Sequence, residues 1–269
     1  MSGYLTGRTP SFACQADPRF SYCLYVPKAH AAGRARARML FAIHDTLRNN
    51  QALRDLFCDF AEESNTVVVA PLFPAGVGVA DDLDNYKYLR CGDVRFDELV
   101  PQMAAEVGAR WGVDGSRFSV FGFSGGAHFA HRFLYVEPAR IEALVVASPG
   151  SVTLPTADFD WWPGLRDFDR IFGKPVDWES VKRVPTHFLV GADDTNPAGI
   201  VQSRDHPNWK EGATAAGGNR VERLRTLHAH LERLGARASF EELPGVGHEL
   251  GPVVEAAISY LRALPPRPA

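Results

Sequence analysis

Short apolar runs alternate along the chain with longer segments in which apolar residues recur every three or four positions. The short runs are rich in β-branched and aromatic residues and end at Pro, Gly or polar residues, as strands do. They predict strands over residues 21–26, 39–43, 66–70, 118–121, 143–147, 187–190 and 239–243. Most of these runs have no polar face, which indicates strands that are buried on both sides of a sheet.

Helical periodicity fills the segments between these strands. Two apolar stripes stand out: Leu99, Val100, Met103, Ala104, Val107 and Trp111, and Val221, Leu224, Leu227, Leu231 and Leu234. Residues 127–135 and 253–261 also predict helices. Strands that alternate with helices are typical of a mostly parallel central sheet with helices on both faces. We therefore predict a single α/β domain over residues 1–269.

The least regular segment, residues 151–184, lies between two predicted strands and is rich in Pro, Asp and aromatic residues. It predicts a cap-like insertion over the carboxyl edge of the sheet, within the same domain. Its adjacent tryptophans, Trp161 and Trp162, have two compatible interpretations: they anchor the insertion on the domain, or they form a wall of a substrate pocket. Large apolar walls are usual in small-molecule sites, so we predict that both contact substrate.

Composition narrows the class of partner. The chain has 269 residues, of which 45% are hydrophobic and 23% charged, and its formal net charge is -3. This charge gives no electrostatic footprint for a nucleic acid. No apolar run approaches the roughly 20 residues of a membrane span, and the first residues contain no secretory signal. The sequence predicts a cytoplasmic protein without membrane or nucleic-acid partners, and it leaves the oligomeric state open.

The four cysteines predict reduced thiols, because no secretion signal accompanies them. Cys14 and Cys23 are close enough in sequence to pair if the protein were exported. No two cysteines have the spacing of a zinc site. We predict no metal and no cofactor.

A five-residue motif carries the first chemical signal. Gly122-Phe-Ser-Gly-Gly126 matches G-x-S-x-G, follows the predicted strand 118–121 and precedes the predicted helix 127–135. Strand, tight turn and helix are the context in which this motif forms a nucleophile elbow, which exposes the serine hydroxyl at the carboxyl edge of a sheet. Ser124 is therefore the candidate nucleophile.

A nucleophilic serine needs a base, and the base needs an orienting carboxylate. In elbow-type hydrolases these groups follow in the chain order Ser, acid, His, each after a strand. Asp193 and Asp194 follow the strand at 187–190, and His248 follows the last predicted strand. Three features in the required order are much more specific than any one of them.

Taken together, the chain resembles the α/β-hydrolase superfamily from about Tyr22 to Leu261. It is most similar to the bacterial branch with polyhydroxyalkanoate-depolymerase-like and feruloyl-esterase-like enzymes. The motifs that carry the resemblance are Tyr22-Cys-Leu-Tyr-Val-Pro27, Ile43-His-Asp-Thr46, Gly122-Phe-Ser-Gly-Gly126, Gly191-Ala-Asp-Asp194 and Pro244-Gly-Val-Gly-His248. The resemblance implies that Ser124 is the nucleophile and that His248 is general base, then general acid. It implies Asp194 as the orienting acid, because the family's Gly-x-x-Asp turn favours Asp194 over Asp193.

The resemblance also implies an oxyanion hole of two backbone N–H groups. Gly125, the residue after the nucleophile, supplies one donor, and by position Thr46 supplies the other. The family usually has His-Gly where this chain has His44-Asp45. The Asp45 carboxylate would oppose the developing negative charge unless its side chain turns away. We expect His44 to brace this loop through hydrogen bonds.

The sequence therefore predicts a serine hydrolase that cleaves a carboxylic ester of a small molecule through an acyl-enzyme. Peptidase, thioesterase, lactonase and C–C hydrolase reactions would use the same residues and stay open. A non-catalytic ligand-binding protein is a second class of interpretation, and Asp45 is the feature that leans towards it. His128, one turn after Ser124, either packs against a neighbouring element or lines the pocket.

Overall fold

The computed structural model describes residues 5–31, 33, 37–200 and 203–265. Its strands are β1 (Gly7–Arg8), β2 (Phe12–Ala13), β3 (Ser21–Val26), β4 (Arg38–Ile43), β5 (Thr66–Leu72), β6 (Arg90–Cys91), β7 (Val94–Arg95), β8 (Phe118–Phe123), β9 (Ile141–Ala147), β10 (Thr186–Gly191) and β11 (Ala238–Leu243). Its α-helices are α1 (Lys28–Ala31), α2 (Asn50–Leu56), α3 (Cys58–Ser64), α4 (Phe96–Trp111), α5 (Gly125–Val136), α6 (Phe168–Phe172), α7 (Trp178–Arg183), α8 (Arg220–Arg233) and α9 (Leu250–Ala263). Two 3₁₀ helices are η2 (Asn85–Tyr88) and η3 (Pro138–Arg140).

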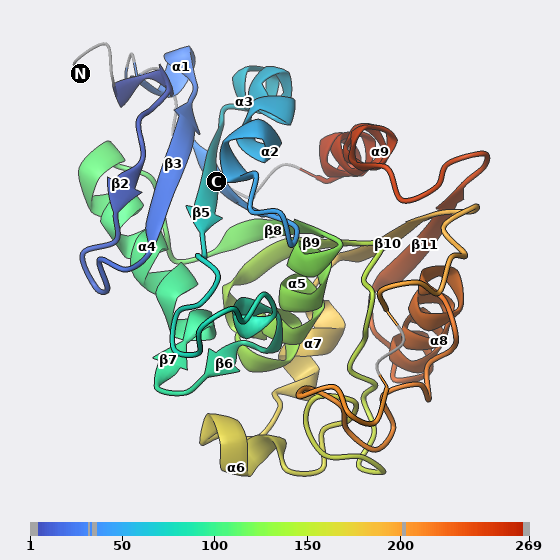
Figure 1. Cartoon of the computed structure of the whole chain (residues 1–269). Helices are drawn as coiled ribbons and strands as arrows, with labels where there is room; N and C mark the ends of the chain where they lie inside the picture. Colours follow the sequence, from blue (N-terminus) through green and yellow to red (C-terminus); the bar gives the residue numbers. More distant parts are fainter. Residues whose placement is uncertain (1–4, 32, 34–36, 201–202, 266–269) are drawn as a thin grey trace.

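One twisted sheet forms the centre of the molecule (Figure 1). Its strand order is β1-β3-β5-β4-β8-β9-β10-β11, with β2 paired to β3. The pairs from β5 through β4, β8, β9 and β10 to β11 are parallel, whereas β3 pairs antiparallel with β5. The predicted fold class, a mostly parallel sheet with helices on both faces, is confirmed.

The two faces of the sheet follow from the alternation of side chains along each strand. In β4, Met39, Phe41 and Ile43 join one hydrophobic cluster, and Leu40 and Ala42 join the other. Residues of α4, α5 and α8 complete the first cluster, and residues of α2, α3 and α9 complete the second. Because both faces are covered, the strands carry the continuous apolar runs seen in the sequence.

The strand at 66–70 was expected to end before Pro71, but β5 continues through Pro71 to Leu72. The pairing of β5 with β4 ends at Val69, whereas its pairing with β3 includes Pro71 opposite Tyr22. Pro71 therefore has a paired neighbour on one side only, which is where a residue without an N–H is tolerated. The two-residue strands β1, β2, β6 and β7 were not predicted, because they are too short to show a period.

The four cysteines Cys14, Cys23, Cys58 and Cys91 are free thiols in this structure. Among the described residues, no helix has both the length and the apolar character needed to cross a membrane.

Candidate active site

Ser124 occupies a sharp turn between β8 and α5. Its backbone angles are φ 52° and ψ -112°, a region that residues other than glycine rarely adopt and that costs conformational energy. The flanking glycines make the turn possible. A Cβ atom at Gly122 would collide with the backbone of Gly126, and one at Gly126 would collide with the carbonyl of Ile43 at the end of β4. The motif thus sets a close approach between two strands and a helix, as expected for a nucleophile elbow.

The close packing at Gly126 predicts that a larger residue there destabilises the protein. Gly126→Ala should lower the free energy of unfolding by about 1–3 kcal/mol, because the added methyl group meets backbone atoms that cannot rotate away. Gly251→Ala is the matched control, since Gly251 also lies in a helix but has open space around it. Chemical denaturation of both variants checks the prediction. Equal stabilities would mean that the packing at the elbow is looser than this geometry.

The three predicted triad side chains form one hydrogen-bonded chain. His248 Nε2 lies 3.0 Å from Ser124 Oγ, and His248 Nδ1 lies 2.7 Å from Asp194 Oδ2. Asp194 follows β10 and His248 follows β11, and these strands are parallel neighbours that end at the same edge of the sheet. The His248 ring also stacks on Phe123 at a centroid distance of 4.7 Å, which fixes the plane of the imidazole.

Asp194 is buried, whereas Asp193 is exposed and makes no side-chain contact with His248. Arg220, at the start of α8, donates from Nη1 to Asp194 Oδ1 at 3.1 Å, so each carboxylate oxygen has a cationic or imidazole partner. Burial acts to raise the pKa of Asp194, but hydrogen bonds and charges from His248 and Arg220 outweigh it and lower the pKa. Asp194 therefore stays ionised at neutral pH, as an orienting carboxylate must.

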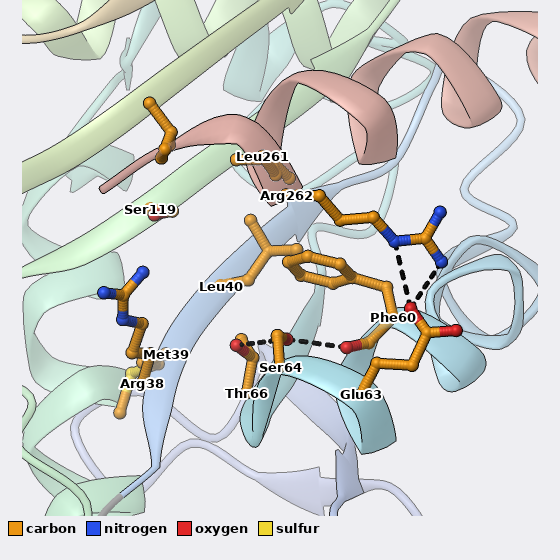
Figure 2. A pocket seen from close by; sticks show the side chains of 11 residues that line it. Arg38, Met39, Leu40, Phe60, Glu63, Ser64, Thr66, Ser119, Leu261 and Arg262 are labelled. Atoms are coloured by element: carbon orange, nitrogen blue, oxygen red, sulfur yellow. Dashed lines mark hydrogen bonds and ion pairs between the residues drawn. The ribbon is translucent and has the colours of Figure 1, made fainter. Parts of the chain in front are cut away.

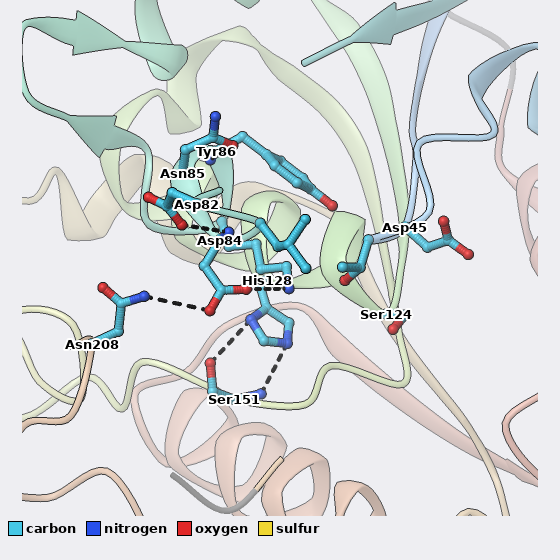
Figure 3. A network of polar contacts seen from close by, with 12 residues as sticks. Asp45, Asp82, Asp84, Asn85, Tyr86, Ser124, His128, Ser151 and Asn208 are labelled. Carbon is cyan, nitrogen blue, oxygen red and sulfur yellow. Dashed lines mark hydrogen bonds and ion pairs between the residues drawn. The ribbon is translucent and has the colours of Figure 1, made fainter. Parts of the chain in front are cut away.

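The predicted oxyanion loop lies against the elbow. A Cβ atom at Gly125 would be 3.0 Å from the backbone nitrogen of Thr46, so the backbone of the loop at Thr46 lies close to the elbow at Gly125. Gly125 is the first residue of α5, where N–H groups have no intrahelical acceptor. The Asp45 carboxylate accepts the N–H of Leu47 at 2.8 Å and is directed away from Ser124 (Figure 3). Asp45 therefore does not point its charge at the amides of Gly125 and Thr46.

Three side chains, of which His44 and Tyr86 are buried and Arg48 is half-buried, hold the loop in place. His44 accepts the N–H of Phe73 at Nε2 and donates from Nδ1 to the carbonyl of Asp45, which agrees with the expected bracing role. Burial lowers the pKa of His44 to about 3, so the ring is neutral and this single tautomer satisfies both bonds. Tyr86 donates its hydroxyl to the carbonyl of His44, and Arg48 donates to the carbonyls of Thr46 and Phe73. Arg48 and Tyr86 were not predicted, because no local motif marks them.

Comparison with known proteins identifies the architecture. A scan against protein-family models finds no match, and neither does a search of curated proteins. Among solved structures, a poly(3-hydroxybutyrate) depolymerase from Bordetella parapertussis superposes with a TM-score of 0.76 at 23% identity, over 97% of this chain and 92% of its own. A poly(aspartic acid) hydrolase-1 from Sphingomonas sp. KT-1 gives 0.73 at 22% identity, over 94% and 98%. An S-formylglutathione hydrolase from Agrobacterium tumefaciens gives 0.64 at 18% identity, over 94% and 92%.

The chain has the α/β-hydrolase fold. At these identities the likeness establishes the fold and leaves the reaction to be argued from the site itself. In this fold, ligands bind beyond the carboxyl ends of the strands. Ser124 lies at that edge, so the space next to it is where a substrate would enter.

A cavity of about 310 Å³ opens beside Ser124. The residues around it come from the predicted oxyanion loop, from η2 and the residue before it, from the elbow and α5, from the two segments that follow β9 and β10, and from the start of α8. A neighbouring cavity of about 750 Å³ shares Thr46, Asp84, Lys87, Tyr88, Gly199 and His206 with it. The two cavities therefore form one groove that runs from Ser124 along the loop before η2.

The structure favours the anchoring interpretation of the two tryptophans. Trp161 and Trp162 are 8% and 4% exposed, and neither lines the cavity beside Ser124. Trp161 packs edge-on against Phe168 and Phe172 within the 151–184 segment. Trp162 packs behind Tyr88, which does line the cavity, and donates its indole N–H to the carbonyl of Asn208. Both tryptophans therefore bury their rings against neighbouring aromatic residues and do not form a wall of the cavity beside Ser124.

The boundary of the 151–184 segment, and not its interior, reaches the site. Within that range only Ser151 lines the cavity. His128 contacts Ser151 through both ring nitrogens and also lines the cavity, so its two interpretations hold together.

A third cavity, of about 500 Å³, lies at the opposite edge of the sheet (Figure 2). Its walls include Leu40 and Ser119 near the starts of β4 and β8, and Leu261 of α9. An ion pair between Arg262 and Glu63 borders it. Because Ser124 lies at the carboxyl ends of these strands, this cavity is not part of the candidate active site.

Proposed function

We propose that this protein is a serine hydrolase that cleaves a carboxylic ester of a small molecule through an acyl-enzyme intermediate. The observation that carries the proposal is the hydrogen-bonded chain from Ser124 through His248 to the buried Asp194, with Ser124 on a strained elbow. In the proposed roles, Ser124 is the nucleophile, His248 the general base and then acid, and Asp194 the orienting carboxylate.

The geometry supports a two-step reaction. His248 Nε2 takes the proton of Ser124 Oγ as the oxygen attacks the ester carbonyl, and the N–H groups of Gly125 and Thr46 stabilise the oxyanion. The protonated His248 then gives its proton to the departing alcohol. In the second step His248 takes a proton from a water molecule, whose oxygen attacks the carbonyl carbon of the acyl-enzyme. The protonated His248 then gives this proton to Ser124 Oγ as the bond between that oxygen and the acyl carbon breaks, which releases the acid and restores Ser124. Asp194 holds the imidazole in one tautomer throughout.

Comparison with solved structures supports this class of reaction. The similar proteins include a poly(3-hydroxybutyrate) depolymerase, an S-formylglutathione hydrolase and a ferulic acid esterase. They act on different compounds, so they support acyl transfer at Ser124 and not one substrate. The same triad would serve a peptidase, thioesterase or C–C hydrolase. The cytoplasmic location and the cap-like role of residues 151–184 stay predictions.

The alternative of a non-catalytic binding protein has little support from the site. Asp45 was the feature that favoured it, and its carboxylate accepts the Leu47 N–H and does not face Ser124. A binding protein would also have no need of three aligned triad groups.

A panel of short-chain esters, thioesters and amides tests the proposal. We expect the wild-type protein to hydrolyse esters, with Ser124→Ala as the matched blank. Esters should be cleaved faster than the corresponding amides, because an alcohol leaves more readily than an amine. If no compound of the panel is cleaved faster by the wild type than by Ser124→Ala, the enzymatic proposal is wrong.

A further inference from the structure

The cavity beside Ser124 is polar, unlike the apolar pocket expected from the sequence. Ile200 is the only aliphatic side chain among the described residues that line it, apart from the stem of Lys87. Hydrogen-bond donors and charged groups occupy most of the remaining wall. Such a wall favours a substrate with polar or charged groups close to the scissile bond.

Lys87 of η2 presents a buried ammonium group to this cavity. The residue is 8% exposed, and its Nζ donates to Asp84 Oδ1 at 2.5 Å. An ammonium group has three donors, and Asp84 is the one described acceptor for them. Lys87 is therefore paired and still able to donate to a ligand.

Ser151 presents a second donor through its hydroxyl group. His128 Nε2 accepts the N–H of Ser151, and burial together with the nearby charge of Arg132 lowers the pKa of His128 well below its usual value. The ring is therefore neutral with its proton on Nδ1, which donates to Ser151 Oγ at 3.1 Å. Arg132 Nη2 donates to the same oxygen at 3.0 Å. Figure 3 shows the two contacts between His128 and Ser151. Since Ser151 Oγ already accepts two bonds, the Ser151 O–H is left to donate.

Two buried guanidinium groups next to the cavity lack an ion pair with any described carboxylate. Arg132 is 0% exposed and bonds to Ser151 Oγ, Thr153 Oγ1 and the carbonyl of Lys87. Arg223 is 1% exposed and bonds to the carbonyls of Gly150 and Ile200. Four of the residues that supply these acceptors, Lys87, Gly150, Ser151 and Ile200, line the cavity. When a buried cation is hydrogen-bonded only by neutral groups, its charge is not cancelled. It therefore leaves a positive potential in the space nearby.

The charges around the cavity do not cancel. Lys87 pairs with Asp84, and Arg220 pairs with Asp194. Arg132 and Arg223 add positive charge, and neither forms an ion pair with a carboxylate of the described residues. The site is thus set to accept negative charge beyond that of the oxyanion formed in the reaction.

We propose that this cavity binds a carboxylate of the ester substrate, held by the Lys87 ammonium and the Ser151 hydroxyl beside the scissile bond. The inference rests on the proposed function and names its substrate class: an ester whose acyl or alcohol part also carries a free carboxylate. A carboxylate fits better than a doubly charged phosphate, because Asp84 lines the same cavity and its repulsion grows with the charge of the ligand.

Two matched pairs of esters test the substrate class. Monomethyl adipate against methyl adipamate places the charge on the acyl side, and 4-carboxyphenyl acetate against 4-carbamoylphenyl acetate places it on the alcohol side. In each pair a neutral amide replaces the carboxylate at nearly constant shape. After correction for the rate with hydroxide alone, we expect the carboxylate of at least one pair to have a kcat/KM about tenfold higher or more, as a charge-assisted bond provides. Raising the ionic strength should reduce this preference.

Variants at the cavity should change the preference with opposite signs. Lys87→Gln should lower the ratio of carboxylate to amide kcat/KM by about 10- to 100-fold, because it removes the cation and leaves Asp84 unpaired. Asp84→Asn should raise the ratio, since the ammonium would then lack a competing anion. Lys182→Gln is the control, because Lys182 pairs with Glu179 on α7 and does not line the cavity. If Lys87→Gln does not fold, Lys87→Arg and Ser151→Ala replace it in the measurement of the ratio of carboxylate to amide kcat/KM.

A binding measurement separates this inference from the proposed function. Calorimetry on Ser124→Ala should show binding of monomethyl adipate or 4-carboxyphenyl acetate that weakens about tenfold or more when Lys87→Gln is added. Ser124-dependent cleavage of neutral esters, with no preference in either pair and no effect of Lys87→Gln on binding, would overturn the carboxylate site and leave the hydrolase proposal intact. Lys87-dependent binding without any cleavage would retain the site and reject the hydrolase.

Discussion

Ser124→Ala should lower kcat for ester hydrolysis by about 10⁶-fold, the scale of loss when a serine nucleophile is removed from a working triad. The loss is this large because Ser124, His248 and Asp194 act as one unit: without Oγ no acyl-enzyme forms and the base has no proton to accept. Steady-state kinetics on the best ester of the panel measures it. A fluorophosphonate probe should label the wild type at Ser124, as located by peptide mapping.

Ser148→Ala is the matched control for this variant. Ser148 follows the neighbouring strand β9, and it shares the positive φ of Ser124, 52° in both residues. Its hydroxyl oxygen is buried and has no hydrogen-bond partner among the described residues. We expect activity within about tenfold of wild type and unchanged labelling, because no base is aligned with this oxygen. Activity or a probe adduct that survives Ser124→Ala would assign the nucleophile to another residue.

The triad could be proposed from the sequence because each member lies in a local pattern. The elbow occupies five consecutive residues, and the steric need for Gly122 and Gly126 leaves a mark in the sequence itself. The acid and the base each follow a strand that an apolar run reveals. Parallel strands end at one edge, so the order of these short segments was enough to bring Ser124, Asp194 and His248 together.

The rest of the cavity has no such local signature. Lys87 and Ser151 lie 64 positions apart. The packing of η2 against α5 brings Lys87 to the cavity, whereas Ser151 comes from the segment after β9, the strand that pairs with β8. Arg132 looks in the sequence like one more polar residue of a helix, yet it is fully buried and bonded to η2 and to the segment after β9. A charge with several long-range partners cannot be told from a solvated one without the fold.

Side-chain direction explains two further differences between the structure and what the sequence predicted. Asp45 was a concern because its position in the chain is next to the predicted oxyanion donor. A local turn, with Leu47 N–H as the donor, takes its carboxylate away from Ser124. Trp161 and Trp162 gave an aromatic signal for a pocket wall, but aromatic residues in a compact segment satisfy one another first. The composition of the segment indicated that the two tryptophans would be buried. It could not tell whether they would face the cavity or the interior of the segment.

Asp194→Asn should lower kcat by about 10⁴-fold, the cost of losing the orienting carboxylate of a serine triad. The amide can present its NH₂ group to His248 Nδ1, which then has to accept a hydrogen bond. The ring proton would move to Nε2, the atom that must take the proton of Ser124. The change also leaves Arg220 without its carboxylate partner in a site where its side chain is 13% exposed, so we expect a lower melting temperature as well.

Asp193→Asn makes the same chemical change one residue earlier. It is the matched control, because Asp193 bonds to neither His248 nor Arg220. Asp193 is exposed, and its hydrogen bonds are made by its backbone: its N–H donates to the carbonyl of Val246, and its carbonyl accepts the N–H of Thr195. Its substitution should leave kcat within about threefold and the melting temperature within a degree or two, as surface changes do. To separate orientation from stability, kcat of Asp194→Asn is measured well below its own melting temperature and compared with Asp194→Glu, which keeps the charge but moves it by one methylene. A larger loss for Asp193→Asn than for Asp194→Asn would reverse the assignment of the acid, because only the residue bonded to His248 Nδ1 can control which nitrogen carries the proton.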